Sequence, residues 1–249
     1  MSPSIDSSGH SRAPHEVKFL ISRDLAEKIR CWASDFMEHD PHTDVSLNYG
    51  YRVRSIYFDT PQLDVFHKRG SFARGKYRNR EYLPAGILFL ERKLKAKGVV
   101  RKRRTTVRAE DLAQLLKTPD KSWSGFWYHR RLELRRLQPT CAISYLRFPF
   151  VSGKISDPIR LTVDEQLSAS HSDGFRFPER NGHGEFLQDR AILELKYLAE
   201  PPVLFKTLVD HFGLRSEPVS KYRLALPVLG LAPKPEPRPE SLETAALCG

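Results

Sequence analysis

In this 249-residue sequence, the residues best suited to binding or catalysis are charged side chains that recur at every second position within apolar segments. Side chains two positions apart in a β-strand share one face of the sheet, so each pair places a carboxylate beside an ammonium group. Carboxylates can hold a hard divalent cation, and lysines attract phosphates, so the pattern predicts phosphate chemistry. The pairs are Glu16-x-Lys18, Glu91-x-Lys93 and Glu194-x-Lys196.

Four further segments with strand-like alternation, at 76–82, 99–107, 143–147 and 158–164, add mainly cations to the same predicted face. Crowded cations repel one another unless an anion lies between them, so the expected ligand is a polyanion. An extended phosphate chain fits a narrow channel better than a folded nucleic acid does. The residues that these segments align are Lys76, Arg78, Arg80, Lys102, Tyr145, Arg147, Arg160, Thr162 and Asp164.

These strands carry charged residues on one face and apolar residues on the other. An ordinary sheet buries its apolar face and exposes the other to water, whereas a barrel can enclose its polar face. The pattern therefore predicts an α+β fold with flanking helices, in which the strands form a β-barrel whose polar side is its interior. Ser22 is typical of a helix N-cap, and a last strand is expected near Lys221. Helices are expected at 22–29, 109–116, 126–137 and 203–212.

The composition limits the class of protein. The chain has 41 basic and 30 acidic residues and a net charge of +11, which favours anionic partners and also fits a solvated basic surface. Three widely spaced cysteines argue against a disulfide framework and favour a reducing cytoplasm. No stretch approaches the roughly 18 apolar residues of a membrane span. We expect one domain at 15–230, between a disordered leader at 1–14 and a disordered proline-rich tail at 231–249.

The sequence contains no nucleophilic triad, Walker loop or dinucleotide fingerprint. The basic run 101–104 resembles a nucleic-acid patch, but its position inside a predicted strand disfavours that interpretation. Glu16, Glu91 and Glu194 either neutralise nearby lysines or supply oxygen ligands to the divalent ion that phosphoryl transfer usually requires. Glu194 is the first choice as a metal ligand, because Lys196 lies on the same face.

Eight short motifs occur in the order found in VTC domains, the catalytic domains of vacuolar transporter chaperone polyphosphate polymerases. That family lies within the CYTH-like triphosphate tunnel superfamily, so the resemblance implies a closed antiparallel β-barrel (triphosphate tunnel) of about eight strands with flanking helices. The resemblance covers nearly all of the predicted folded unit, and the order of eight motifs is more specific than any one of them. The motifs are Ser55-Ile56-Tyr57-Phe58-Asp59-Thr60, Arg78-x-Arg80, Leu90-Glu91-Arg92-Lys93, Lys102-Arg103-Arg104, Tyr145-x-Arg147, Arg160-Leu161-Thr162-Val163-Asp164, Leu193-Glu194-Leu195-Lys196-Tyr197 and Ser220-Lys221-Tyr222.

The resemblance implies an enzyme that cleaves ATP and passes its terminal phosphate to a growing polyphosphate chain inside a basic tunnel, with a manganese or magnesium ion. Its ligands would be ATP and polyphosphate, and no specific nucleic acid is expected. The resemblance does not identify a protein partner. The implied metal ligand is Glu194, and the strand pattern adds Glu16 and Glu91 as candidates. Phosphates would be held by Lys18, Arg78, Arg80, Lys93, Lys102, Arg147, Arg160, Lys196 and Lys221, with assistance from Tyr145, Ser220 and Arg104.

Two positions depart from the pattern of the wider superfamily. Its hydrolases open with Glu-x-Glu-x-Lys, whereas Pro14 takes the first of those positions here, which disfavours a two-metal triphosphatase. Pro218 stands where the eukaryotic polymerases tend to place another lysine, three residues before Lys221. The alternatives are a hydrolase of tripolyphosphate or nucleoside triphosphates, and a noncatalytic module that binds polyphosphate or inositol phosphates. Metal dependence separates these classes, because binding can persist without the ion whereas turnover should not.

Overall fold

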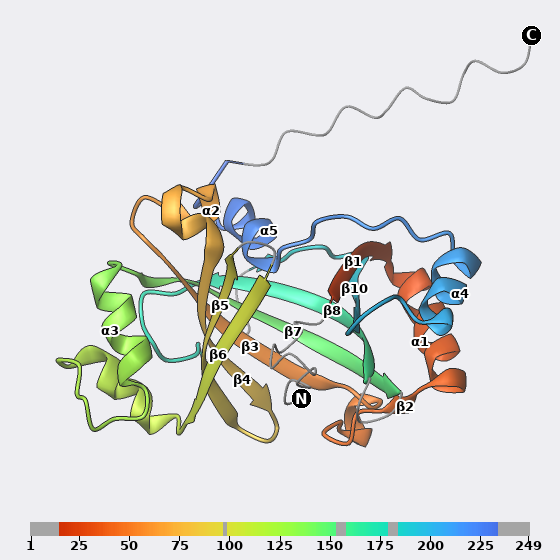
Figure 1. Cartoon of the computed structure of the whole chain (residues 1–249), viewed down its shortest axis with the longest axis horizontal. Coiled ribbons are helices and arrows are strands. Elements are labelled where there is room, and N and C mark those ends of the chain that lie inside the picture. Colours follow the sequence, from red (N-terminus) through yellow and green to blue (C-terminus); the bar gives the residue numbers. More distant parts are fainter. Residues whose placement is uncertain (1–14, 97–98, 153–157, 179–183, 234–249) are drawn as a thin grey trace, which may run out of the picture.

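The structure is a computed structural model that describes residues 15–96, 99–152, 158–178 and 184–233, and it is built around one antiparallel sheet (Figure 1). The expected leader at 1–14 and most of the expected tail lie outside these residues. The strands are β1 (His15–Ser22), β2 (Glu38–His39), β3 (Tyr51–Asp59), β4 (Gly75–Leu83), β5 (Ile87–Ala96), β6 (Val99–Val107), β7 (Gln138–Ser152), β8 (Ile159–His171), β9 (Gly184–Glu185) and β10 (Arg190–Tyr197). The helices are α1 (Arg23–Phe36), α2 (Asp64–His67), α3 (Phe126–Leu134), α4 (Val203–His211) and α5 (Lys221–Val228).

The ten-stranded sheet has the order β1-β10-β8-β7-β3-β4-β5-β6, with β2 beside β7 and β9 beside β8. Within the described residues β1 and β6 are the two ends of this order and do not pair, so the expected hydrogen-bonded closure of a barrel is not confirmed. The sheet nevertheless curls, because Nζ of Lys93 on β5 lies 3.1 Å from Oε2 of Glu16 on β1. A side-chain ion pair therefore bridges the two end regions of the sheet.

The strand register explains how one sequence pattern produces two different faces. Directly paired residues share a face, and Lys18 pairs with Glu194, which pairs in turn with Thr162. In the other half of the sheet, Arg78 pairs with Glu91. The alternate positions, such as Phe19 opposite Leu193, are buried in an apolar cluster. The polar positions form the inner face of the curled sheet, as the period-two alternation predicts.

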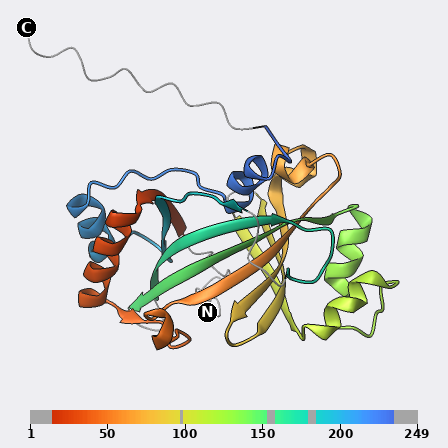
Figure 2. The same cartoon turned by 180° about the vertical axis from the view of Figure 1, so that it is seen from behind.

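Helices cover the outer, apolar face at both ends of the molecule (Figures 1 and 2). Helices α1 and α4 bury Ile29 and Phe205 in the cluster that contains the outer side chains of β1, β7, β8 and β10. At the opposite end, α3 places Tyr128 against Phe58 and Tyr77, with each pair of ring centroids 6.0 Å apart. Apolar burial of this kind is the main stabilising contribution, and it leaves the polar inner face free for chemistry.

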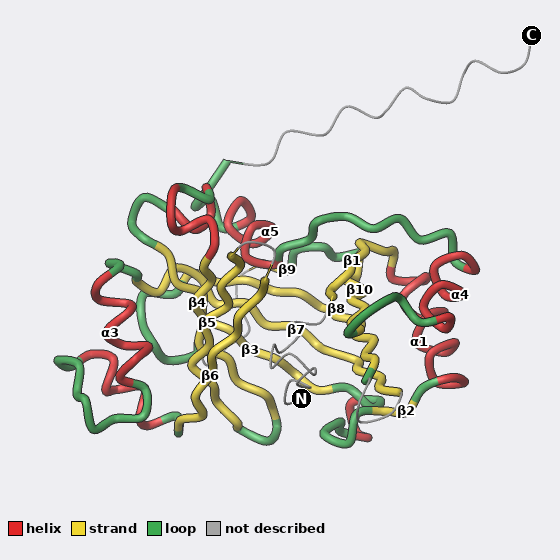
Figure 3. Tube along the Cα trace, in the orientation of Figure 1, coloured by secondary structure: helices red, strands yellow, loops and turns green. Residues whose placement is uncertain are grey.

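The local signals of the sequence are mostly confirmed, with one error (Figure 3). Ser22 caps α1, since its hydroxyl accepts a hydrogen bond of 3.2 Å from the backbone N–H of Leu25. The helix expected at 109–116 is a 3-10 helix, Glu110–Leu116. The strand expected near Lys221 is wrong, because that residue begins α5. The short segment Ser220-Lys221-Tyr222 has too few residues for its periodicity to distinguish a strand from the start of a helix.

Among the described residues, no helix combines the length and apolar character that crossing a membrane would take.

Candidate phosphate-binding tunnel

The strand register brings the sequence-predicted site residues onto the inner face of the sheet, where strands from distant parts of the chain meet. Strand β1 carries Glu16 and Lys18, while α5 contributes Ser220 as its N-cap and Lys221 as its first residue. The predicted residues from the other strands are Arg78 and Arg80 on β4, Glu91 and Lys93 on β5, Lys102 and Arg104 on β6, Tyr145 and Arg147 on β7, Arg160 on β8, and Glu194 and Lys196 on β10.

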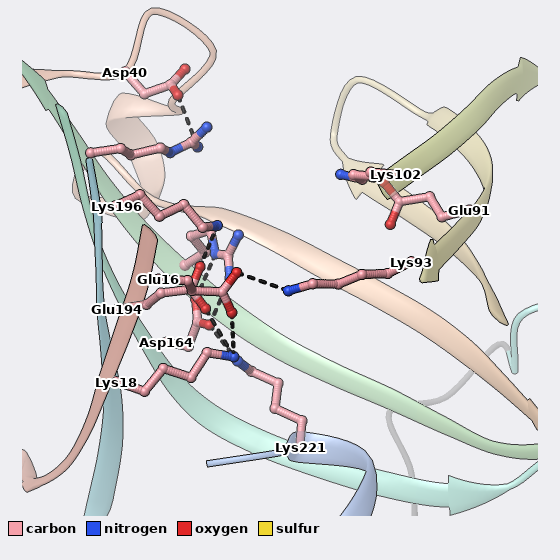
Figure 4. A network of polar contacts seen from close by, with 12 residues as sticks. Glu16, Lys18, Asp40, Glu91, Lys93, Lys102, Asp164, Glu194, Lys196 and Lys221 are labelled. Carbon is pink, nitrogen blue, oxygen red and sulfur yellow. Dashed lines mark hydrogen bonds and ion pairs between the residues drawn. The ribbon is translucent and has the colours of Figure 1, made fainter. Parts of the chain in front are cut away.

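The first group of charges lies where β1 and β10 pair (Figure 4). Nζ of Lys18 lies 2.8 Å from Oε1 of Glu16 and 3.1 Å from Oε2 of Glu194. Lys196 forms an ion pair with the other oxygen of Glu194. Burial raises the pKa of Glu194, but the adjacent Lys196 and Lys18 outweigh burial and hold it well below its usual range. Both carboxylates are therefore ionised at neutral pH.

The second group surrounds Asp164, which is fully buried on β8. Arg147 donates two hydrogen bonds to its carboxylate, at 2.6 Å from Nε and 2.7 Å from Nη2. Lys221 donates a third of 2.5 Å to Oδ2. This bidentate geometry is the strong form of an arginine–carboxylate pair. It fixes Arg147 and ties the start of α5 to the inner face of the sheet.

The third group lies on β4, β5 and β6, across the inner face from Glu194 in Figure 4. Glu91 is buried and accepts from Arg78, with Nε of the arginine 2.7 Å away, while Nζ of Lys102 lies 3.0 Å from its other oxygen. Lys93 belongs to the same strand but extends to Glu16. Both oxygens of Glu91 are thus occupied by cations of neighbouring strands.

Arg80 differs from these paired cations. It is only 5% exposed, its Nε donates to the Ser55 hydroxyl at 3.1 Å, and it forms no ion pair among the described residues. The hydroxyl of the buried Tyr145 also has no hydrogen-bond partner in the described part of the chain. The charge of Glu91 acts on Arg80 through space, but the carboxylate contacts Arg78 and Lys102 directly. Among the described residues, Arg80 is therefore a buried cation that no carboxylate contacts, an arrangement that costs free energy.

The excess of positive charge on the inner face also lowers the pKa of two tyrosines. Burial raises the pKa of Tyr57, but Arg78 and Arg80 outweigh burial and bring it to about 8. Burial likewise raises the pKa of Tyr82, but Arg80, Arg147 and Arg78 together outweigh burial and leave a value of about 8. Nearby cations favour the negative phenolate over the neutral phenol. The inner face therefore stabilises negative charge where these rings lie.

Comparisons with known proteins agree with this geometry. The family model of the VTC domain matches residues 13–229, which is most of the chain. The chain belongs to the VTC domain family. A comparison with curated protein sequences finds no match.

Solved structures that resemble this VTC domain have low sequence identity to it. A candidate adenylate cyclase from Bacillus halodurans is 14% identical, with a TM-score of 0.50 over 82% of this chain and 92% of that one. A candidate adenylyl cyclase from Hippeastrum, described as having a dominant triphosphatase activity, is 14% identical, with a TM-score of 0.49 over 83% of this chain and 92% of that one. At such identities the likeness concerns the fold alone.

The predicted metal ligands of this VTC domain do not gather into one site. Glu16 and Glu194 share the ammonium group of Lys18, so their carboxylates lie close together, whereas Glu91 is bound by Arg78 and Lys102. Within the described ranges, no group of three or more His, Cys, Asp or Glu residues could hold a metal ion. The donor set at Glu16 and Glu194 fits a cation that takes its remaining ligands from substrate phosphates, as magnesium commonly does. Glu91 lies on β5, outside this carboxylate pair.

The sequence prediction missed several side chains of this inner face. The sequence alternation places Asp164 on the same face as the cations but does not indicate a role for it. In the structure Asp164 forms ion pairs with Arg147 and Lys221. Asp40, in the loop after β2, lies 3.0 Å from Arg160, whose other partner at 2.8 Å is the hydroxyl of Tyr51. Lys76 donates to Ser220 at 3.1 Å, and burial, with Lys18, Lys93 and Arg78 nearby, lowers its pKa to about 8. Only the alternation at 76–80 signalled Lys76, and nothing local signalled Asp40.

Proposed function

We propose that this VTC domain is a metal-dependent polyphosphate polymerase that transfers the terminal phosphate of ATP to a growing polyphosphate chain. The observation that carries the proposal is Arg80, a buried guanidinium with no carboxylate partner among the described residues. A phosphate group beside it would supply the missing negative charge. Family membership supports the choice of a phosphate chain over other anions.

The proposed reaction breaks the bond between the terminal phosphorus of ATP and its bridging oxygen, and ADP carries away that electron pair. A terminal oxygen of the polyphosphate chain attacks the same phosphorus, so no protein nucleophile is required. Arg78, Arg80 and Arg147 would align the two phosphate chains and stabilise charge that spreads over the transferred group. Lys18 and Lys196 would hold the phosphates close to Glu194.

The proposed metal position is the carboxylate pair of Glu194 and Glu16. A manganese or magnesium ion bound there would neutralise phosphate charge and orient the transferred group. Lys18, which contacts both carboxylates, would then move toward a phosphate oxygen. Glu91 would hold Arg78 and Lys102 in place and would not bind the ion.

Product analysis tests the proposal. The purified protein is incubated with ATP and manganese or magnesium, and the products are resolved by length. We expect a ladder of polyphosphate and the release of one ADP for each phosphate added to the chain. Orthophosphate as the sole phosphate product would establish the hydrolase instead. Tight polyphosphate binding without nucleotide turnover, with or without the metal, would establish a noncatalytic module.

A further inference from the structure

A second cationic site lies outside the sheet, between its outer face and α3. The pocket is open to solvent, has a volume of about 430 Å³ and is lined by Arg92, Arg103, Trp127, Arg130, Arg131 and Leu134. We call it the outer arginine pocket. Arg92 follows Glu91, and Arg103 follows Lys102, so both arginines point to the face of the sheet opposite the tunnel. The pocket is thus separated from the inner face by the thickness of the sheet.

The strand register and the helix period together assemble this pocket. Arg92 on β5 pairs directly with Arg103 on β6, which places two like charges side by side. Such a pair is destabilising unless an anion or another group compensates it. On α3, residues 130 and 131 follow Trp127 by three and four positions, so all three lie on one side of the helix. The paired strands β5 and β6 and the helix α3 therefore direct four arginine side chains into one pocket.

Trp127 holds two of these guanidiniums in position. Its indole Nε1 donates a hydrogen bond of 2.8 Å to the hydroxyl of Thr105, which fixes the ring. The guanidinium carbon of Arg103 lies 4.2 Å from the ring centroid, and that of Arg92 lies 5.6 Å away. Both distances are within the range of a cation–π contact. The arginines are thereby ordered without a carboxylate.

The four arginines lack acidic partners. None of them forms an ion pair or a side-chain hydrogen bond with another residue in the described part of the chain, and Nε of Arg92 is buried without an acceptor. The tunnel differs in this respect, because Arg78 and Arg147 each contact a carboxylate. Arg103, Arg130 and Arg131 are exposed and can reach a ligand, while Trp127 contacts Arg92 and Arg103. The pocket is therefore complementary to a compact, multiply charged anion.

We propose that the outer arginine pocket is a second phosphate-binding site, which takes a short run of linked phosphates. Guanidinium forks grip two phosphate oxygens at once, and four of them match a ligand with several phosphate groups. A nucleic acid fits less well, because guanidiniums already lie over the ring of Trp127, where a base would have to stack. The ligand is either a free short phosphate chain or a segment of long polyphosphate. The site does not depend on the proposed polymerase activity, because its occupancy is measured without turnover.

Calorimetric titration with tripolyphosphate, in the absence of ATP and metal, tests this site. The test variant is Arg103→Gln/Arg131→Gln. The matched control is Arg23→Gln/Arg215→Gln, which removes two exposed arginines near α1 and α4 and changes the net charge equally. We expect two equivalents of tripolyphosphate for the parent and the control. For the test variant we expect one equivalent, or a second that binds at least about tenfold more weakly.

A second measurement keeps the result independent of folding. Tryptophan fluorescence should change as the parent and the control bind tripolyphosphate, because bound phosphates alter the charge beside the ring of Trp127 that Arg103 contacts, and this change should be absent in the test variant. The thermal midpoint of the test variant without phosphate should equal or exceed that of the parent. A weaker affinity of the test variant for long polyphosphate as well would assign the pocket to a chain segment, whereas an unchanged affinity would assign it to a free short anion.

Three results would overturn the proposal. The first is a single equivalent in the parent that the test variant retains with parental affinity. The second is a test variant that binds two equivalents with parental affinity. The third is an oligonucleotide that binds the parent, loses affinity in the test variant and is not displaced by tripolyphosphate. Because the titration contains no ATP, a failure here leaves the proposed polymerase activity unaffected, and a failure of the polymerase assay leaves this site unaffected.

Discussion

Glu16 and Lys93 form an ion pair of 3.1 Å although their strands are the first and the seventh in the order of the sheet. Their side chains bridge the end regions that the backbone leaves unpaired among the described residues. The curl of the sheet is thus supported by two charges of its inner face. The shape of this face therefore depends on residues that we propose to contact a ligand.

A double-mutant cycle of Glu16→Gln and Lys93→Met should measure this bridge. The Lys93 side chain is 41% exposed, so we expect a coupling free energy of only about 0.5 to 1 kcal/mol at low salt, and less as salt screens the pair. Because Glu16 also contacts Lys18, only the cycle isolates the pair from the single effects. Denaturant unfolding of the four proteins gives the values. A coupling near zero at low salt would mean that the bridge does not hold the curl.

Arg80 and Arg147 should respond in opposite ways to the same substitution. Arg147→Met leaves the buried Asp164 without its bidentate partner, so it should lower the free energy of unfolding by about 3 to 5 kcal/mol. Arg80→Met removes a buried charge that has no carboxylate partner among the described residues, so it should leave stability unchanged or raise it in phosphate-free buffer. Both variants should bind tripolyphosphate at least about tenfold more weakly. Equal destabilisation by the two substitutions would contradict this difference between the sites.

The sequence predicted the inner face well because that face depends on a local property. The alternation of Glu91 with Lys93, and of Glu194 with Lys196, determines which side chains share a face, whatever the strands pair with. Which cation meets which carboxylate depends instead on register and curvature across distant segments. The pairing of Asp164 with Arg147 joins two strands, and Lys221 reaches it from a helix, so no local pattern could reveal it. The sequence predicts many unpaired cations on this face, but in the structure carboxylates from other strands neutralise most of them. Arg80 is an exception.

Tyr57 should ionise at an unusually low pH and stop doing so when phosphate binds. Its pKa of about 8 lies below that of an unfolded tyrosine, so its contribution to stability is absent below pH 8, grows as pH rises and is complete above about pH 10. Tyr57→Phe should remove that gain. Bound tripolyphosphate neutralises Arg78 and Arg80 and should shift the phenol back toward its ordinary pKa. Phenolate absorbance measured with and without tripolyphosphate checks this, and an unchanged titration curve would count against an anion in the tunnel.

Glu194→Gln should separate a metal ligand from a residue that only balances charge. Removing the carboxylate charge should lower turnover at least about 100-fold and raise the manganese concentration needed for half-maximal activity. Glu91→Gln is the matched control, since Glu91 is also buried between two cations but does not fit the metal site. The control should lose activity without a change in its manganese requirement. If the two variants shift that requirement equally, Glu194 has no special role toward the ion.

The fate of the terminal phosphate of ATP tests the central claim most directly. The purified protein is given ATP labelled at that phosphate, together with manganese, and the label is followed by chain length over time. Transfer predicts that the label enters polyphosphate longer than three phosphates, that ADP accumulates in step with it, and that Arg80→Met suppresses both. Label found only in orthophosphate, at a rate that Arg80→Met leaves unchanged, would contradict both the transfer reaction and the role of the tunnel.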